Sequence, residues 1–243
     1  KIPFISTFAM FASGRAYEQI RNSICYPKLN VKIAATHAGL TVGEDGASHQ
    51  SIEDISLMRS IPNMTVLVPA DGTETCQAIQ FAAEYDGPVY IRLGRMAVPD
   101  LFTEEYRFEH GKAVCLVEGT DATIVATGIM VHIAKEAAEK LQVEGFSVRV
   151  LNIHTIKPID KDAIVKAAEQ TGAIVTCEEH SIIGGLSSAV AEVLVENFPV
   201  PMERVGVRDT FGESGIPKEL LKKYGLTVDD VVLAVKKVIA RKA

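Results

Sequence analysis

Residues 31–50 of the chain are VKIAATHAGLTVGEDGASHQ, an apolar run followed directly by a polar, glycine-rich loop. The run Val31–Ala35 is continuously hydrophobic, which is typical of a strand buried on both faces of a parallel sheet. In open α/β sheets, ligands bind at the carboxyl ends of such strands. This stretch therefore predicts a buried strand that ends at a ligand-binding loop.

The same pattern continues on both sides of this stretch. A first strand is expected at Ile2–Ser6, and further apolar runs are Thr65–Val68, Val89–Leu93, Ala122–Thr127, Val148–Ile153, Ala173–Cys177 and Arg204–Val207. The segments with helical patterns are Gly14–Ile24, Thr73–Tyr85, Met130–Val143, Asp160–Gln170, Leu186–Asn197 and Val228–Ala240. Because strands and helices alternate, we expect an α/β fold with mostly parallel sheets and helices on both sheet faces.

The composition changes between Met96 and Lys112, where no hydrophobic period is sustained and Pro99 and Gly111 occur. We therefore predict a linker at residues 99–112 that separates a unit at 1–98 from a unit at 113–243. Each unit is expected to be a three-layer α/β/α domain. The first is short for a complete domain of this kind, so we expect its N-terminal part to be missing.

The composition excludes several classes of protein. With 47% hydrophobic and 23% charged residues, the 243-residue chain has the balance of an ordinary globular protein. The formal net charge is −6, so we expect no nucleic-acid partner. No run approaches 18 uninterrupted apolar residues, so no membrane span is expected. The four cysteines lie far apart and form no C-x-x-C pair, which favours reduced thiols and a cytoplasmic location.

The 36–50 loop is the densest polar segment of the chain, and its glycines would allow His37, Asp45 and His49 to come together. Two imidazoles and an acid could transfer protons, bind sugar hydroxyls or ligate a metal. A solvated turn with surface charges would have the same composition. We predict no metal site, because no closely spaced histidine pair defines the ligand geometry.

Three other groups of residues could take part in a site or in the fold. Phe8 and Phe11 follow the first strand at a spacing of three, which is also typical of core residues. Arg92 and Arg95 lie at a strand end, either as an anion clamp or as exposed rim residues. Residues 178–180, Glu-Glu-His, are expected to form a turn before a helix rather than an anion site.

The segment GEDGASHQ at 43–50, preceded by Thr36 and His37, resembles the GEDGPTHQ signature of transketolases. The segments Ile61-Pro62-Asn63 and Pro69-Ala70-Asp71-Gly72 follow in the order and spacing of that family, as does Arg95. The resemblance covers the whole chain. Residues 1–98 resemble the pyrimidine-binding domain, and residues 113–243 resemble the transketolase C-terminal domain.

This resemblance implies a thiamine diphosphate-dependent transferase that moves a two-carbon glycolaldehyde unit from a ketose phosphate to an aldose phosphate, as in the pentose phosphate pathway. The Gly-Asp-Gly…Asn motif for thiamine diphosphate and magnesium does not occur in the chain. The resemblance therefore implies the C-terminal subunit of a split transketolase. The pyrimidine half of the cofactor would lie on this chain, and an N-terminal partner subunit would hold the diphosphate with Mg²⁺ or Ca²⁺. A homodimer of this chain within a heterotetramer is the implied assembly.

The resemblance also implies cofactor-binding residues. Phe8 and Phe11 match the aromatic pocket around the aminopyrimidine ring, and Glu44 belongs to the matching signature. Gly14 stands where many family members have a tyrosine. The glutamate that activates the cofactor in the family would precede Lys1 and is expected outside this sequence.

The implied catalytic residues are His37, Asp45 and His49, which with Arg95 are also the implied substrate-binding residues. His37 and Arg95 match positions that hold the sugar phosphate. Asp45 matches the acid that binds the hydroxyl group at carbon 2 of the acceptor. His49 matches a histidine near the reacting carbonyl group.

Related enzymes remain as alternatives. The residues that follow Gly14, Arg15-Ala16-Tyr17, resemble those of 1-deoxyxylulose-5-phosphate synthases. The β chain of a 2-oxo acid dehydrogenase is disfavoured by the Glu44-Asp45 pair and by Ile61-Pro62-Asn63. A non-catalytic partner or scaffold subunit would keep the same fold.

Overall fold

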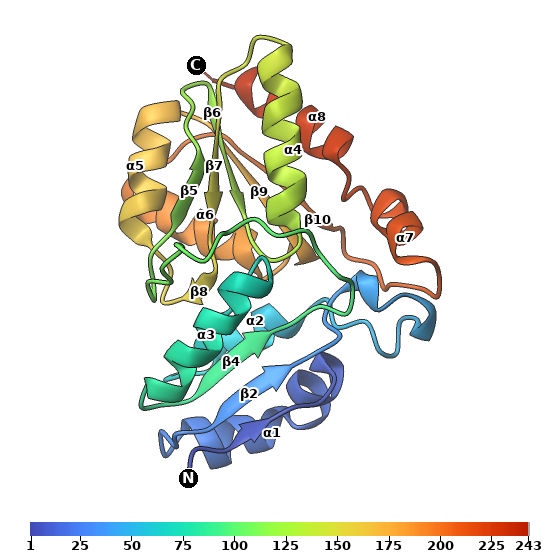
Figure 1. Cartoon of the computed structure of the whole chain (residues 1–243). Coiled ribbons are helices and arrows are strands. Elements are labelled where there is room, and N and C mark those ends of the chain that lie inside the picture. The colour runs from blue at the N-terminus through green and yellow to red at the C-terminus, as the bar shows by residue number, and fades with distance from the viewer. Residues whose placement is uncertain (243) are drawn as a thin grey trace.

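The computed structural model describes residues 1–242, in which two five-stranded sheets lie one above the other (Figure 1). The strand order of the first sheet is β1-β2-β4-β3-β8, and its strands are β1 (Phe4–Ile5), β2 (Lys32–Ala35), β3 (Thr65–Leu67), β4 (Val89–Arg92) and β8 (Thr155–Lys157). The pairs among β1–β4 are parallel, whereas β8 pairs antiparallel with β3. Two α/β units with mostly parallel sheets confirm the expected fold class.

The second sheet has the order β10-β9-β6-β7-β5. Its strands are β5 (Val114–Val117), β6 (Ala122–Ala126), β7 (Val148–Asn152), β9 (Ile174–Ser181) and β10 (Met202–Val207). Only the pair of β5 with β7 is antiparallel within the described sheet. The continuous apolar runs therefore become parallel strands, because such strands are covered on both faces.

The helices lie between and around these strands. The α-helices are α1 (Tyr17–Gln19), α2 (Asp54–Ser60), α3 (Gly72–Glu84), α4 (Met130–Val143), α5 (Lys161–Thr171), α6 (Leu186–Asn197), α7 (Pro217–Lys223) and α8 (Val228–Ile239). Two π-helical turns, η1 (Phe11–Arg15) and η2 (Ile20–Cys25), flank α1, and a 3₁₀ segment, η3 (Leu40–Asp45), lies in the 36–50 loop. Where a single helix was expected at 14–24, the chain thus forms three consecutive short helical segments, η1, α1 and η2. None of the helices in residues 1–242 has the length and apolar character that crossing a membrane requires.

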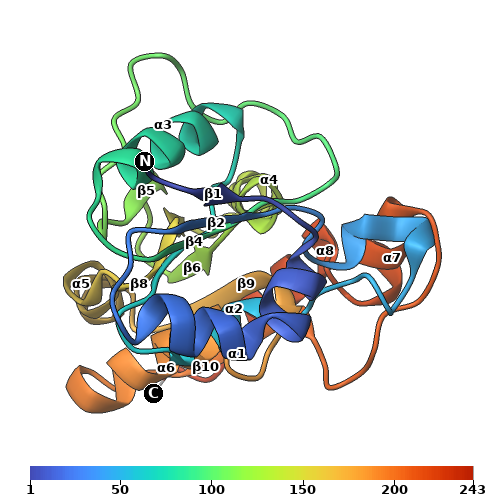
Figure 2. The ribbon, with the colours of Figure 1, turned by 90° about the horizontal axis from the view of Figure 1, so that it is seen from below.

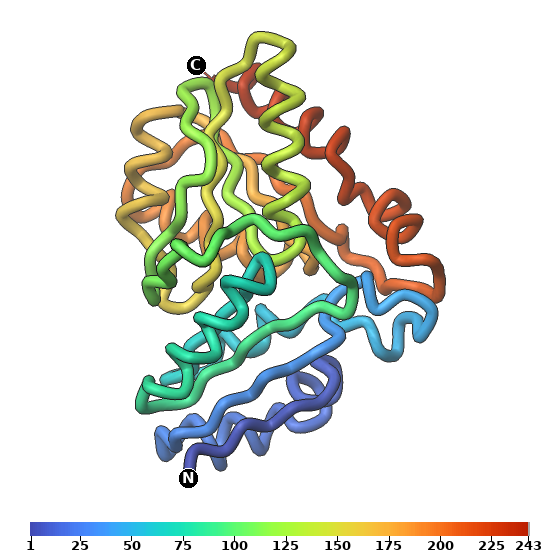
Figure 3. The backbone as a smooth tube through the Cα atoms, viewed as in Figure 1, coloured from blue at the N-terminus to red at the C-terminus, as the bar shows by residue number. Residues whose placement is uncertain are grey.

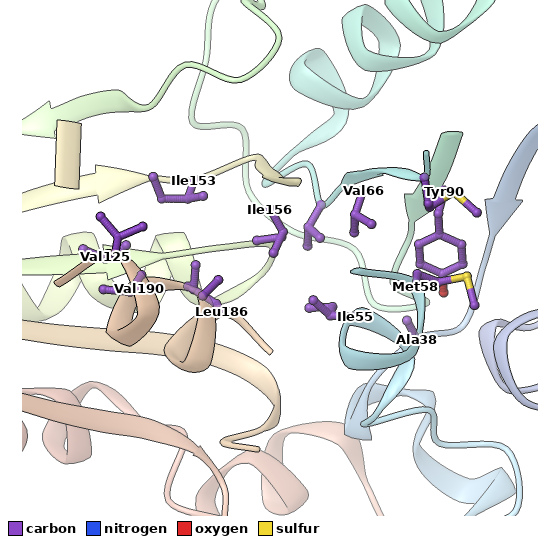
Figure 4. Close-up of a cluster of buried hydrophobic side chains, with 14 of the residues drawn as sticks. Ala38, Ile55, Met58, Val66, Tyr90, Val125, Ile153, Ile156, Leu186 and Val190 are labelled. Carbon is purple, nitrogen blue, oxygen red and sulfur yellow. The ribbon is translucent and has the colours of Figure 1, made fainter. Parts of the chain in front are cut away.

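One of the three buried hydrophobic clusters of residues 1–242 is shared by the two sheets. Strand β8 follows β7 of the second sheet closely along the chain, yet it pairs with β3 of the first. The hydrophobic cluster continues across this connection, as Figure 4 shows, from Tyr90 and Val66 through Ile156 to Val125 and Leu186. Burial of this continuous apolar surface fixes the units relative to each other.

The 96–112 segment contains no helix or strand and lies alongside α3 (Figure 2). Asp71 accepts hydrogen bonds from the N–H groups of Leu101 and Phe102, at 2.8 and 2.9 Å. The buried carboxylate of Glu74 accepts from the Tyr106 hydroxyl at 2.6 Å and from Asn152 Nδ2 at 2.9 Å. The segment is therefore bound along its length, while the domain boundary within it stays a prediction.

Candidate functional site

The residues after β1 and the residues after β2 lie side by side, because the two strands are parallel. Phe8 forms a bridge with Thr36 just beyond the strand ends. The N–H of Ala9 donates to the carbonyl oxygen of Thr36 at 2.7 Å, and the N–H of Thr36 donates to that of Thr7 at 2.9 Å. This pairing brings Phe8 next to His37 at the start of the 36–50 loop.

Four of the sequence-predicted site residues form one aromatic group. The rings of Phe8 and His37 are stacked, with centroids 4.0 Å apart and an interplanar angle of 8°. Phe11 stacks beside Phe8 at 5.9 Å. The His49 ring approaches Phe8 and Phe11 edge-on, at 5.9 and 5.3 Å. All four side chains are half-buried, so the group combines aromatic rings and imidazoles that are partly accessible to a ligand.

His37 has a backbone conformation that is unusual for a residue with a side chain. Its φ angle is +58°, in the left-handed region. This conformation costs about 1–2 kcal/mol outside glycine. The bridge at Thr36 and the stacking on Phe8 hold it, and Nδ1 lies 3.0 Å from the Thr36 hydroxyl oxygen. A strained residue at a strand end next to a loop is typical of functional sites.

Arg95, Glu44 and Asp45 lie at the exposed side of the loop. The Arg95 guanidinium donates to the carbonyl oxygen of Val42 and lies 3.3 Å from Glu44 Oε2. This ion pair is exposed and contributes little stability. Within residues 1–242, no hydrogen bond or ion pair joins the exposed Asp45 carboxylate to either imidazole. The structure thus brings Arg95 to the loop, whereas the exposed Asp45 carboxylate is not bonded to the aromatic group.

Arg92 lies beneath the loop and corrects the sequence interpretation of this residue. It is 7% exposed, so it is not an exposed rim residue, and its guanidinium is paired within the protein. Its Nε donates to both oxygens of Asp54, at 2.8 and 3.1 Å, and the Tyr90 hydroxyl donates to the same carboxylate at 2.8 Å. Its Nη2 donates to the carbonyl oxygens of Ser51 and Glu179. This buried ion pair therefore joins the end of the 36–50 loop to the second sheet.

Residues 178–180 were expected to form a turn, but they continue strand β9 as far as Ser181. Glu178 accepts hydrogen bonds from the N–H groups of Leu186 and Ser187, and so caps α6. Glu179 points to the opposite face, where its Oε1 accepts the N–H of Thr41 at 2.6 Å. Burial raises the pKa of Glu179 to about 7. In the sequence, the sign that these residues are buried in a strand was that Glu178, Glu179 and His180 directly follow the apolar run Ala173–Cys177.

A second support of the loop comes from Gln50 and from the residues between β10 and α7. Gln50 Nε2 donates to the carbonyl oxygens of Leu40 at 3.1 Å and Glu213 at 2.9 Å. A Cβ added at Gly46 would lie 2.5 Å from Ser214 Oγ, so the two segments are in close contact. Figure 3 shows the segment before α7 reaching from the upper unit to this loop. Sequence patterns gave no indication of this contact.

Comparison with known proteins assigns the chain to a family. The transketolase pyrimidine-binding domain matches residues 1–100, and the transketolase C-terminal domain matches residues 111–231. The chain belongs to the transketolase family. The family resemblance expected from the GEDGASHQ loop is thereby confirmed.

Relatives of the transketolase chain include separate subunits. A solved structure described as "Split gene transketolase, inactive beta4 tetramer" is 60% identical, with a TM-score of 0.95 over 100% of this chain and 78% of that chain. A 6-deoxy-6-sulfo-D-fructose transketolase subunit, SqwH, of Clostridium sp. (strain MSTE9) is 48% identical over 100% of this chain and 75% of its own length. A 1-deoxy-D-xylulose-5-phosphate synthase of Heliobacterium modesticaldum is 37% identical over 94% of this chain and 36% of its own length.

The pyrimidine-binding domain implies thiamine diphosphate, and the aromatic group fits half of this cofactor. The stacked, half-buried faces of Phe8 and Phe11 suit a flat heteroaromatic ring. A Cβ at Gly14 would lie 2.6 Å from Met10 Cε, so methionine occupies space beside the position where many transketolases have tyrosine. Residues 1–242 contain no cluster of three or more side chains that could hold a metal ion. The aromatic group therefore suits the pyrimidine ring of the cofactor.

Proposed function

We propose that this chain is the C-terminal subunit of a transketolase made of two polypeptides. It transfers a two-carbon glycolaldehyde unit from a ketose phosphate to an aldose phosphate, together with an N-terminal subunit that binds the diphosphate and its Mg²⁺ or Ca²⁺. The observation that carries the proposal is the aromatic group in which His37 and His49 lie against Phe8 and Phe11. Relatives described as a split-gene protein and as a subunit support the two-polypeptide form.

The residues of this chain have distinct roles in the proposal. Thiamine diphosphate supplies the carbanion chemistry when it is bound. Phe8 and Phe11 would bind the pyrimidine ring through their apolar faces, and Glu44 would be a further cofactor-binding residue. His37 and His49 exchange protons with the oxygens of the sugar, since imidazole transfers protons readily near neutral pH.

Two further residues bind the substrate. Asp45 is exposed and accepts a hydrogen bond from the hydroxyl group at carbon 2 of the acceptor. Arg95 and His37 bind the phosphate group, because the guanidinium fork matches two phosphate oxygens. The 36–50 loop, which carries three of these residues, is called the substrate loop below.

The proposed assembly is a homodimer of this chain within a heterotetramer, and the proposed location is the cytoplasm. The relative described as a β4 tetramer supports self-association of such a subunit. Sugar phosphates of the pentose phosphate pathway are the proposed substrates. Because one relative is named for a sulfonated ketose, the shared substrate feature is an anionic group at the end of a ketose.

A second candidate function is that of a 1-deoxyxylulose-5-phosphate synthase-like enzyme. The guanidinium of Arg15 lies 4.5 Å over the Phe11 ring, and Arg15-Ala16-Tyr17 resembles those synthases. Assay of the reconstituted complex for each of the two activities distinguishes the two functions.

We predict that the chain alone has no transketolase activity and gains activity when it is mixed with the diphosphate-binding subunit. The reason is that half of the cofactor site lies on the partner, and the reaction requires all groups in position. The measurement is the rate of transfer from a ketose phosphate to an aldose phosphate, with added thiamine diphosphate and Mg²⁺.

A Phe11→Ala variant should reduce the activity of the mixture, whereas Phe198→Ala, at an exposed position at the end of α6, serves as the matched control. Activity of the purified chain without its partner would contradict the two-polypeptide proposal. A mixture that binds the cofactor but transfers nothing would favour a scaffold role.

We predict that Asp45→Ala reduces acceptor discrimination more than cofactor affinity. A hydrogen bond from a hydroxyl to a carboxylate contributes about 1.5–3 kcal/mol, or about 13- to 160-fold in kcat/KM. The measurement is kcat/KM for an aldose phosphate and for its 2-deoxy analogue, with Glu104→Ala as an exposed control. An unchanged preference for the 2-hydroxy acceptor would refute the role of Asp45.

We predict that Arg95→Ala raises the KM for a phosphorylated donor by about 13- to 160-fold, since a charge-assisted hydrogen bond is worth about 1.5–3 kcal/mol. The KM for hydroxypyruvate, which carries no phosphate, should change little. His37→Ala should show the same pattern more weakly. Arg107→Ala is the matched control at an exposed arginine. Equal losses with both donors would mean that Arg95 supports the fold or the cofactor instead.

A further inference from the structure

Glu179 lies directly under the substrate loop, although it belongs to the second sheet. Its Oε1 accepts the N–H of Thr41 at 2.6 Å. A Cβ added at Gly39 would lie 2.3 Å from the Glu179 carboxyl group, and Gly39 has a φ of +86° that favours glycine. The loop backbone therefore covers the carboxyl group and leaves Glu179 only 3% exposed.

The charged and titratable groups that face Glu179 form one buried cluster. They are Arg92 and Tyr90 on β4 and Asp54 on α2, together with the polar Thr41 of the loop. Glu178 and His180 lie on the other face of β9, where Glu178 caps α6. The cluster thus holds two carboxyl groups and one guanidinium.

This charge count determines which group takes a proton. The cluster is neutral only when one of its two acids is protonated. Asp54 accepts hydrogen bonds from Arg92 Nε and from the Tyr90 hydroxyl, whereas Glu179 accepts one from Arg92 through its backbone oxygen and not through its carboxyl group. Glu179 therefore takes up a proton more readily than an exposed glutamate does, in agreement with the rise of its pKa to about 7 by burial.

We propose that Glu179 is a positioning residue of the substrate loop, whose carboxyl group holds the loop closed when protonated and loosens it when ionised. The closed loop is the state in which Thr41 donates to Glu179. The inference rests on the proposed function in one respect, namely that this loop binds the substrate. Glu179 contacts the backbone of the loop, so it affects the substrate indirectly, by positioning His37, Asp45 and His49.

Proton linkage gives the direction of the effect. In the closed loop the pKa of Glu179 is raised from 4.5 to about 7 by burial. A lifted loop would return the carboxyl group to water, where its pKa falls back toward the ordinary value. The closed state thus binds the proton more tightly, so raising the pH from about 5 to about 8 favours the lifted loop.

Three variants separate these states. Glu179→Gln keeps the shape and an acceptor for the Thr41 N–H but cannot ionise, so its loop should stay closed across the pH range. Glu179→Ala removes the acceptor and should loosen the loop at every pH. Glu169→Gln removes an exposed acid on α5 and is the matched control.

The first measurement is amide hydrogen exchange of the chain alone, followed in a peptide that spans residues 37–46. Dividing the wild-type rate by the Glu179→Gln rate at the same pH cancels the intrinsic pH dependence of exchange. The ratio should rise by up to about tenfold between pH 6 and pH 8.5, because the effect develops as the pH passes from the lower pKa of 4.5 to beyond the higher pKa of about 7. Glu169→Gln should follow the wild type at both pH values.

The second measurement is the acceptor KM of the reconstituted enzyme. The wild-type KM should rise by about three- to tenfold relative to that of Glu179→Gln over the same pH interval, with a smaller change in kcat. Any pH dependence that comes from His37 and His49 is present in both proteins and cancels. The midpoint of thermal unfolding should also be higher for Glu179→Gln than for the wild type at high pH, because no buried charge forms.

The outcomes separate this inference from the proposed function. An exchange ratio that stays near 1 at both pH values overturns the role of Glu179, whatever the activity. A ratio that rises with pH in a mixture without transferase activity supports the role of Glu179 and overturns the proposed function. If Glu179→Ala does not fold, the comparison of the wild type with Glu179→Gln still tests whether ionisation of Glu179 loosens the loop.

Discussion

The buried ion pair between Arg92 and Asp54 is the contact on which the rest of the site depends, because desolvated charges tolerate little displacement. Taking either charge out of water costs several kcal/mol unless its partner stays within hydrogen-bond distance. The same guanidinium donates to the carbonyl oxygens of Ser51, at the end of the substrate loop, and of Glu179, on β9. The requirement to pair one arginine thus fixes the loop to both sheets.

The two units of the chain contribute different parts of the site. The first unit supplies the aromatic rings and imidazoles, which come together because β1 and β2 are parallel and end at the same edge. The second unit supplies their support, through Glu179 under Gly39 and through the segment around Ser214 against Gly46. The C-terminal unit, which carries none of the predicted site residues, therefore determines how the substrate loop is held.

The sequence predicted the features that depend on local pattern. Apolar runs such as Val31–Ala35 indicated buried parallel strands, and the loop after this run indicated the site and the family. It could not predict contacts between distant positions. Arg92 contacts Asp54 only in the folded chain. The polar residues 178–180 looked like a turn, but they can lie in a buried strand because Glu178 accepts from the N-terminus of α6 and Glu179 accepts from the N–H of Thr41. Short strand β8 was missed, since its pairing with β3 is set by tertiary packing.

A double-mutant cycle on Asp54→Ala and Arg92→Met, with the free energy of unfolding measured in urea, tests this dependence most directly. Each single substitution leaves one buried charge without its partner and should cost about 3–5 kcal/mol. The double variant should cost less than the two single costs added together, by at least about 2 kcal/mol, because no unpaired charge remains. Costs that simply add would contradict the central role of this ion pair.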